Sequence, residues 1–373
     1  MRTRPFVVLA ALAAVALAAS ACSGTAPTPD SSPNDSGPAP ATLSIIWPTA
    51  APTPNEQVGA YAVAVEMGYF AEENLTTTVN NADGSTAAIQ AVASGSADVT
   101  ATSALSLVPA VAQGVPIKAF GGLVQNWPYQ IAVAPESPVK SVKDLEGKKI
   151  GIISLASASN GYTRAALTLA GLDPDADAEL IPVGAGASAG AALMSGEVEV
   201  LALYGAAYGN LEAAGLELRY LDNDPFFSDL FSLTFATTPD NLENNSDVLT
   251  RFGRAMYKGT LFTAANPEAA MRMGYKVFPT LLSSGSVEEN IEKDTATLKT
   301  WLVSAVPLTG GPEDWSDWGQ ITPERWDSFQ NFMMEYTDNL DAKVSIDKLW
   351  DGSLVEGMND FDSQKVIDQA KAQ

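Results

Sequence analysis

Apolar runs and segments of helical spacing alternate along the first third of the chain. They predict strands at residues 43–47, 75–80 and 99–101 and helices at residues 58–70, 85–94 and 104–113. Gly95 and Gly114 follow the last two of these helices, where glycine favours the left-handed conformation that ends a helix. Strands that alternate with helices in this way predict an α/β fold.

The same order of elements returns in the middle of the chain. It predicts strands at residues 149–153, 179–183 and 198–203 and helices at residues 162–170 and 188–195. The remainder is mostly helical, with helices expected at residues 247–263, 267–277, 287–303 and 323–339. Behind the N-terminal segment lie about 330 residues, more than one core comfortably holds, so we expect two lobes.

The N-terminal residues predict export and lipidation. A basic start is followed by mostly apolar residues 6–19 and by three small residues before Cys22. This apolar run is shorter than the roughly 20 residues that a bilayer crossing needs, so residues 1–21 are predicted to be a signal peptide. Cys22 is the only cysteine, and we predict that it carries lipid as the first residue of the mature chain. The alternative is an ordinary secretory signal with an incidental cysteine.

Residues 22–41 are predicted to be a flexible tether. They contain small and polar residues and prolines with no large apolar side chain, so they cannot bury enough surface to become ordered. Two or more acyl chains on Cys22 would hold the protein firmly on a membrane, whereas one would be marginal. We therefore expect an extracytoplasmic protein that is lipid-anchored to the outer face of the cell membrane.

Charge and composition narrow the function. The formal net charge of −23 argues against a nucleic-acid partner. The chain has no histidine, which removes the commonest general base and metal ligand. We expect no cofactor, no metal site and no catalytic residue.

Several short motifs occur in an order and spacing that are specific together, although each alone is weak. They lie at residues 59–70, 91–99, 113–118, 140–151, 170–174 and 194–199, and the fourth reads KSVKDLEGKKIG. In this order they resemble the ABC-transporter substrate-binding lipoproteins of the sulfonate, nitrate and thiamine-precursor binding family. The resemblance covers nearly all of the mature chain.

The resemblance implies the type II periplasmic-binding-protein fold, with two lobes, a hinge and a ligand cleft between the lobes. Lobe one would comprise residues 42–131 and 233–373, and lobe two residues 132–232. Two strands, near residues 130–134 and 232–236, would cross the hinge. The C-terminal helices would pack mainly on lobe one.

Polar ligand-binding side chains are expected where strands end and helices begin, because the first N–H groups of a helix lack partners. Two such junctions in the first lobe contain Ser85 with Thr86, and Ser103. In the second lobe a Ser-rich turn offers donors and acceptors at Ser157, Ser159 and Asn160. Helix capping or a purely structural turn explains the same residues equally well.

Aromatic residues gather near the same strand ends and give the remaining candidates, Trp47, Trp127, Tyr129 and Tyr204. Aromatic walls with a few polar groups suit a planar or partly apolar ligand better than bare nitrate. Ordinary core packing is the alternative. Arg164 has the chemistry to bind a ligand anion, but an ion pair within the protein is favoured.

These observations predict the solute-binding subunit of an ABC importer, not an enzyme. It would capture a small organic ligand, anionic or aromatic to heteroaromatic, by hinge closure and deliver it to a permease that an ATPase drives. We expect a monomer. Gln57 stands where thiamine-precursor relatives carry His, which weakens the case for a pyrimidine. A lipid-anchored sensor of the same fold and a pyrimidine-forming enzyme are the alternatives, and the lack of histidines and of a cysteine-rich motif disfavours the enzyme.

Overall fold

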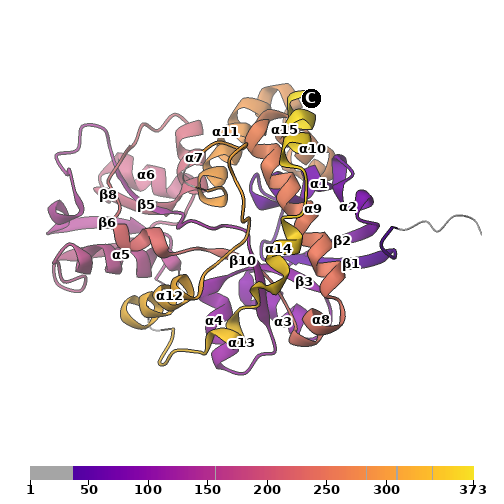
Figure 1. Ribbon diagram of the computed structural model, residues 1–373. Coiled ribbons are helices and arrows are strands. Elements are labelled where there is room, and N and C mark those ends of the chain that lie inside the picture. The colour runs from indigo at the N-terminus through magenta and orange to yellow at the C-terminus, as the bar shows by residue number, and fades with distance from the viewer. Residues whose placement is uncertain (1–36, 156, 283, 308–309, 338) are drawn as a thin grey trace, which may run out of the picture. The chain divides into compact units, whose positions relative to one another are not determined.

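The computed structural model describes residues 37–155, 157–282, 284–307, 310–337 and 339–373 (Figure 1). The predicted signal peptide and Cys22 lie outside these residues. From Pro38 onward the chain is bound to the folded body: the Asn74 side-chain amide donates to the Pro38 carbonyl at 3.0 Å, and Arg251 donates to the Ala39 carbonyl at 3.3 Å. The tether, predicted to reach Ala41, is therefore too long, because residues 38–41 belong to the body.

The first sheet has the strand order β2-β1-β3-β10-β4. Its strands are β1 (Ala41–Trp47), β2 (Leu75–Asn81), β3 (Val99–Ser103), β4 (Lys118–Gly122) and β10 (Leu233–Thr237). β1 is parallel to β2 and β3, whereas β10 is antiparallel to both of its neighbours.

The second sheet repeats this plan with the order β7-β6-β8-β5-β9. Its strands are β5 (Tyr129–Val133), β6 (Lys148–Ile152), β7 (Ala178–Pro182), β8 (Val200–Tyr204) and β9 (Arg219–Tyr220). β5 is antiparallel to β8 and β9. The α/β prediction is confirmed. The segments that pass between the sheets are residues 123–128 and 221–232, and the antiparallel strand of each sheet follows directly after one of them.

Helices follow strands in both halves. They are α3 (Ser85–Ala93), α4 (Ala104–Ala112), η2 (Val142–Leu145), α5 (Ala158–Leu169), α6 (Ala187–Ser195), α7 (Gly205–Ala213) and η3 (Pro225–Asp229). Of these, α3, α4, α5 and α6 were predicted, whereas η2, α7 and η3 were not. α5 begins four residues earlier than its predicted start at Tyr162. Its first residues look like a loop in sequence, but Gly161 lies against Thr337, where an added Cβ would be 2.7 Å from the threonine methyl group.

The helix predicted at residues 58–70 is interrupted. The structure has a π-helical turn, η1 (Gln57–Ala62), then α1 (Val63–Glu66) and α2 (Tyr69–Glu72). Gly68 separates the last two with a φ of 75°, a conformation that glycine adopts without strain. The sequence pattern shows the apolar spacing but not this break.

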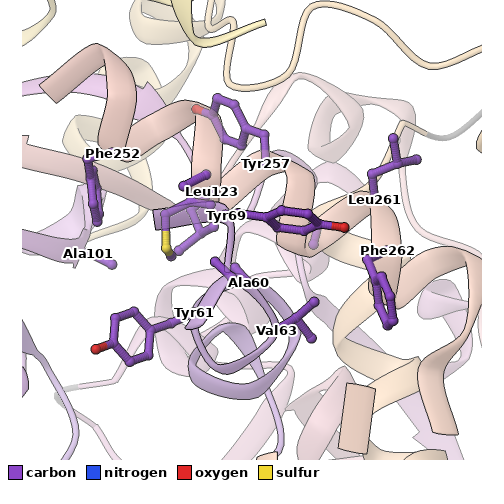
Figure 2. Close-up of a cluster of buried hydrophobic side chains, with 14 of the residues drawn as sticks. Ala60, Tyr61, Val63, Tyr69, Ala101, Leu123, Phe252, Tyr257, Leu261 and Phe262 are labelled. Carbon is purple, nitrogen blue, oxygen red and sulfur yellow. The ribbon is translucent and has the colours of Figure 1, made fainter. Parts of the chain in front are cut away.

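A large core covers one face of the first sheet, with η1 at its centre (Figure 2). Tyr61 and Val63 lie there beside Phe252 and Phe262 of α9 (Ser246–Ala265). The two helices approach so closely that a Cβ on Gly259 would be 2.1 Å from the Ala60 carbonyl oxygen. This close packing fixes the position of the residues just before η1.

The other helices of the C-terminal part are α8 (Pro239–Asn244), α10 (Pro267–Val277), η4 (Pro279–Leu281), α11 (Val287–Ala305), α12 (Pro323–Tyr336), α13 (Ile346–Leu349), η5 (Gly352–Leu354), α14 (Val355–Met358) and α15 (Ser363–Lys371). Both α14 and α15 pack along α9 (Figure 1). Across the described part of the chain, no helix has the length and apolar character that a bilayer crossing needs.

The prediction that these helices pack mainly on lobe one is wrong for α12 and incomplete for α11. α12 packs against α5 and η3 of the second half, because Phe329, Phe332 and Tyr336 recur at helical spacing and join the core that contains Tyr162. α11 contacts both α10 and α7. The lobe boundaries at residues 131 and 232 stay a prediction.

Candidate ligand-binding cleft

A cleft of about 370 Å³ lies where the two sheets and both crossing segments meet, and we call it the main cleft. Its lining residues come from the turn after β1, from α3, from the crossing segments, from β5, β8, β10 and α7, and from α11. They are Pro48, Thr49, Asn55, Glu56, Ser85, Val124, Pro128, Tyr129, Tyr204, Gly205, Ala206, Ser232, Leu233, Trp301 and Ser304.

A second cavity of about 430 Å³ adjoins the main cleft at Tyr129, which lines both. Thr86 and Ser103 line it from one side, and Ala158 and Thr337 from the other. Together the two cavities run along the carboxyl ends of the strands, the edge at which α/β proteins bind ligands.

The structure brings Ser85, Thr86 and Ser103 close together at this edge. The backbone N–H of Ser103 donates to the Ser85 hydroxyl oxygen at 3.2 Å, and the backbone N–H of Leu105 donates to the Ser103 hydroxyl oxygen at 3.3 Å. Each hydroxyl thus accepts a structural hydrogen bond and keeps its own proton available to donate. Capping and ligand contact are compatible roles here.

Tyr129 and Tyr204 face each other across β5 and β8 and line the main cleft. Their ring centroids are 6.2 Å apart in an edge-to-face arrangement. Burial raises the pKa of both hydroxyls above the ordinary value, so both remain neutral donors. Trp127 lies behind Tyr129 at a centroid distance of 5.1 Å and lines a neighbouring cavity instead.

Trp47 does not reach the cavities described above. It is 0 % exposed, belongs to the core of the first sheet, and meets the ring of Tyr61 edge-on at 6.2 Å. Its neighbours Leu43 and Ile45 on the same face of β1 are buried too. Trp47 is therefore a core residue, and its prediction as a wall of the cleft does not match its position.

The polar groups of the Ser-rich turn at the start of α5 form hydrogen bonds within the turn itself. The Ser157 hydroxyl donates to the Ser154 carbonyl at 2.7 Å, the Ser159 hydroxyl oxygen accepts from the Ile153 N–H at 2.8 Å, and the Asn160 amide donates to the Leu155 carbonyl at 2.9 Å. Ser159 is fully buried. None of Ser157, Ser159 and Asn160 lines the main cleft or the second cavity. The structural alternative accounts for them.

Two residues that line the main cleft, Glu56 and Trp301, were not predicted from the sequence. Glu56 is 4 % exposed, and within the described part of the chain no cation pairs with it. Burial raises the pKa of its carboxyl from 4.5 to about 7, against a smaller opposing effect of its own backbone N–H. Trp301 is 5 % exposed, and its indole N–H finds no acceptor among the residues that the structure describes. Only tertiary burial distinguishes them from a surface acid and a core tryptophan.

Positive charge is missing from the cleft walls. None of the described residues that line the main cleft or the second cavity is Lys or Arg. Arg164, the candidate anion ligand, makes a two-pronged ion pair with Asp175 at 2.7 and 2.9 Å, the alternative favoured from the sequence. Nor does the described part of the chain gather three or more acidic, cysteine or histidine side chains that could hold a metal.

A family profile described as NMT1/THI5 like matches residues 55–270, which is more than half of the chain. The chain belongs to this family. The matched segment begins at Asn55, in the wall of the main cleft beside Glu56, and includes the strand ends that carry Ser85, Ser103 and Tyr204.

Among curated relatives, this NMT1/THI5-like chain is similar to the riboflavin-binding protein RibY of Chloroflexus aurantiacus. The two are 29% identical over 275 residues, which cover 71% of this chain and 76% of RibY.

Solved structures share the fold. The periplasmic aliphatic sulphonate binding protein SsuA from Escherichia coli superposes with a TM-score of 0.65 at 18% identity, over 84% of this chain and 94% of SsuA. The desulfurization enzyme DszB superposes with a TM-score of 0.55 at 14% identity, over 85% of this chain and 98% of the enzyme. The predicted periplasmic-binding-protein fold is confirmed. At these low identities the solved structures support the fold and give no information about the ligand or the activity of this chain.

Proposed function

We propose that this chain is the extracytoplasmic solute-binding subunit of an ABC importer, held at the outer face of the cell membrane by lipid on Cys22. It captures a small organic ligand between its two sheets and delivers it to a membrane permease driven by an ATPase. Its partners are the ligand, these two subunits and the membrane. The folded body acts as a monomer and binds no nucleic acid.

The observation that carries the proposal is the position of the main cleft. Its walls come from both sheets and from both crossing segments, residues 123–128 and 221–232, so any relative movement of the sheets changes its width. A ligand there touches both halves when they are close together. It can favour the closed state only through the additional contacts it makes in that state.

The ligand size and character follow from the walls. About 370 Å³ falls in the range of small-molecule sites, and Tyr129, Tyr204 and Trp301 supply aromatic surface. Hydroxyl and amide groups at Ser85, Ser232 and Asn55 supply a few polar contacts. A planar organic molecule suits these walls better than a small inorganic anion.

A thermal-shift panel tests the function. The purified protein is unfolded and refolded to remove any carried ligand, and is then offered riboflavin, an aminopyrimidine, an aromatic carboxylate, an organosulfonate, taurine and nitrate. A ligand present at 100 times its dissociation constant adds about 2.7 kcal/mol to the free energy of unfolding and raises the midpoint clearly. A correctly folded protein that none of these compounds stabilises would contradict the proposal.

Catalysis is the weaker candidate, although DszB shows that the fold also supports an enzyme. The chain has no histidine, and its single cysteine stands at position 22, outside the described residues. A serine nucleophile at the cleft would need a base within reach, and the described lining offers only Glu56. Recovery of an unchanged ligand after prolonged incubation with the protein is the expected result.

A further inference from the structure

Glu56 occupies an unusual position in the wall of the main cleft. It directly precedes η1, whose packing against α9 fixes it in place, and only 4 % of its surface is exposed. Burial of a carboxylate with neither a cation nor several hydrogen-bond donors costs folding free energy. A ligand that supplies the missing donor would recover part of that cost.

The charged groups around η1 do not supply this donor. The helices packed against it are α1, α9, α10 and α11. Every cation of α9 and α10 has an acidic partner elsewhere. On α9, Arg251, Arg254 and Lys258 pair with Asp247, Glu73 and Glu72, respectively. On α10, Arg272 pairs with Glu268 and Glu288, and Lys276 pairs with Glu66. On α11, Lys293 and Lys299 are exposed to solvent. Tyr204 is the titratable neighbour across the cleft, and the charge of Glu56 adds to burial in raising its pKa.

The surrounding walls select for a flat molecule. Tyr129 and Tyr204 come from paired strands of the second sheet, and Trp301 comes from α11. The Trp301 ring is itself held by Gly59, where a Cβ would lie 2.3 Å from the indole. A planar ring that enters between these aromatic side chains meets the carboxylate of Glu56 in the same cleft.

We infer that Glu56 determines ligand class: its carboxylate accepts a hydrogen bond from an N–H group of a planar nitrogen heterocycle that is neutral or positively charged. This inference rests on the solute-binding function proposed above. An organic anion would place a second negative charge beside Glu56 in a cleft whose described lining has no Lys or Arg. Sulfonates and carboxylates therefore bind more weakly, and the anionic ligand class expected from the sequence is not the one we propose.

The first test compares binding of matched probes. Riboflavin and 4-aminopyrimidine present N–H donors, whereas pyrimidine-4-carboxylate has a similar ring with a negative charge. The wild-type protein binds at least one of the two N–H probes more tightly than the carboxylate. Glu56→Gln weakens that binding about tenfold or more, because a hydrogen bond to a charged acceptor is about twice as strong as one to a neutral acceptor.

Glu66→Gln is the matched control, because it removes the same charge from the neighbouring α1 while its partner Lys276 lies outside the cleft lining. It changes the affinity less than twofold. Unchanged or tighter binding of the N–H probe by Glu56→Gln overturns the inference. Tighter binding of pyrimidine-4-carboxylate than of the N–H probes by the wild-type protein overturns it as well.

Proton exchange gives an independent readout. At pH 7 a carboxyl with a pKa of about 7 is half protonated, and an N–H donor favours its ionised form. Calorimetric titration of the N–H probe in phosphate and in Tris therefore shows release of up to about half a proton per ligand bound. Glu56→Gln abolishes this release. Net proton uptake with a probe that does not itself titrate near pH 7, such as riboflavin, overturns the inference, because it means that the ligand favours the neutral carboxyl.

The outcomes separate the two proposals. If only sulfonates or carboxylates bind and Glu56→Gln has no effect, solute binding stands and the role of Glu56 is refuted. If the folded protein binds no member of the panel, both proposals are contradicted.

Discussion

The wall of the main cleft at Glu56 and the Ser-rich turn before α5 differ in how far their polar groups are already used. On the first-sheet side, Glu56 has no ion-pair partner among the described residues and the indole N–H of Trp301 has no acceptor. On the second-sheet side, the turn before α5 satisfies Ser157, Ser159 and Asn160 within itself. The Ser-rich turn therefore uses its polar groups internally, whereas Glu56 and Trp301, like the neutral hydroxyls of Tyr129 and Tyr204, remain able to bind a ligand.

The length of the connection explains why the Ser-rich turn differs from the turn that carries Ser103. Between β6 and α5 there are five residues, 153–157, enough for the chain to fold back and hydrogen-bond with itself. Between β3 and α4 there is none, because Ser103 ends the strand and Ala104 begins the helix. A turn without spare residues leaves its side chains directed at the edge of the sheet. Polar composition alone therefore does not identify a binding turn.

The largest expected effect is on the second-sheet side. Trp127→Ala removes an indole that contacts Tyr129, Tyr162, Phe227 and two phenylalanines of α12. We expect a loss of about 4 kcal/mol in the free energy of unfolding, measured by urea denaturation. Trp127→Phe should lose much less. An alanine variant as stable as the wild type would show that this wall is not part of the core.

Glu56→Gln should stabilise the protein in a pH-dependent way. The folded state holds the Glu56 proton up to about pH 7, whereas the unfolded chain releases it near 4.5. The stability linked to this proton is present below pH 4.5 and is lost as the pH rises to about 7, at 1.36 kcal/mol per unit. At pH 8 the glutamine variant should therefore gain up to about 3 kcal/mol over the wild type.

At pH 4 the same variant should gain little, because both forms of residue 56 are then neutral. Urea denaturation at the two pH values measures the difference. A gain that is the same at pH 4 and pH 8 would contradict the assignment of Glu56 as an unpaired buried carboxyl.

Ser159→Ala separates structure from binding on the second-sheet side. It removes the acceptor of the Ile153 N–H, and we expect a loss of about 1–2 kcal/mol in the free energy of unfolding. The affinity for ligand should change less than twofold, as measured by calorimetry. A large drop in affinity with unchanged stability would place the Ser-rich turn in the site after all.

Ser85→Ala should give the smallest effect. In contrast to Ser159→Ala, it should lower the affinity for ligand at least as much as it lowers the stability of the fold. Ser85 lines the main cleft and its hydroxyl proton is free to be donated to a ligand, so we expect about a fivefold loss of affinity, equivalent to about 1 kcal/mol. The loss of the acceptor for the Ser103 N–H affects stability by a similar or smaller amount. Ser94→Ala, at the far end of α3 and exposed, is the control.

Much of the fold could be predicted from the sequence, because apolar spacing and helix-ending glycines are local signals. Most strands and helices begin and end within one or two residues of their predicted positions. The π-helical turn at η1 and the packing of α12 on α5 could not be predicted from the sequence, because both depend on contacts with side chains that are distant along the chain. The early start of α5 was hidden by residues that favour turns.

The site was predicted in part. Strand ends led to Ser85, Thr86, Ser103, Tyr129 and Tyr204, and the structure gathers these at one edge. The core position of Trp47 could have been predicted from the sequence, because Leu43, Ile45 and Trp47 are two residues apart and therefore lie on the same face of the strand. Glu56 and Trp301 carried no local signal, because a glutamate before a helix and a tryptophan within one are common in any fold.

Hydrogen exchange of the ligand-bound protein tests the contrast between the two sides most directly. The ligand is riboflavin or the compound of the panel that binds most tightly, and peptides across the whole chain are compared with and without it. We predict several-fold slower exchange in the peptides that contain Glu56 and Ser85, with no change in residues 153–160. Protection of residues 153–160, with none around Glu56 and Ser85, would contradict the account.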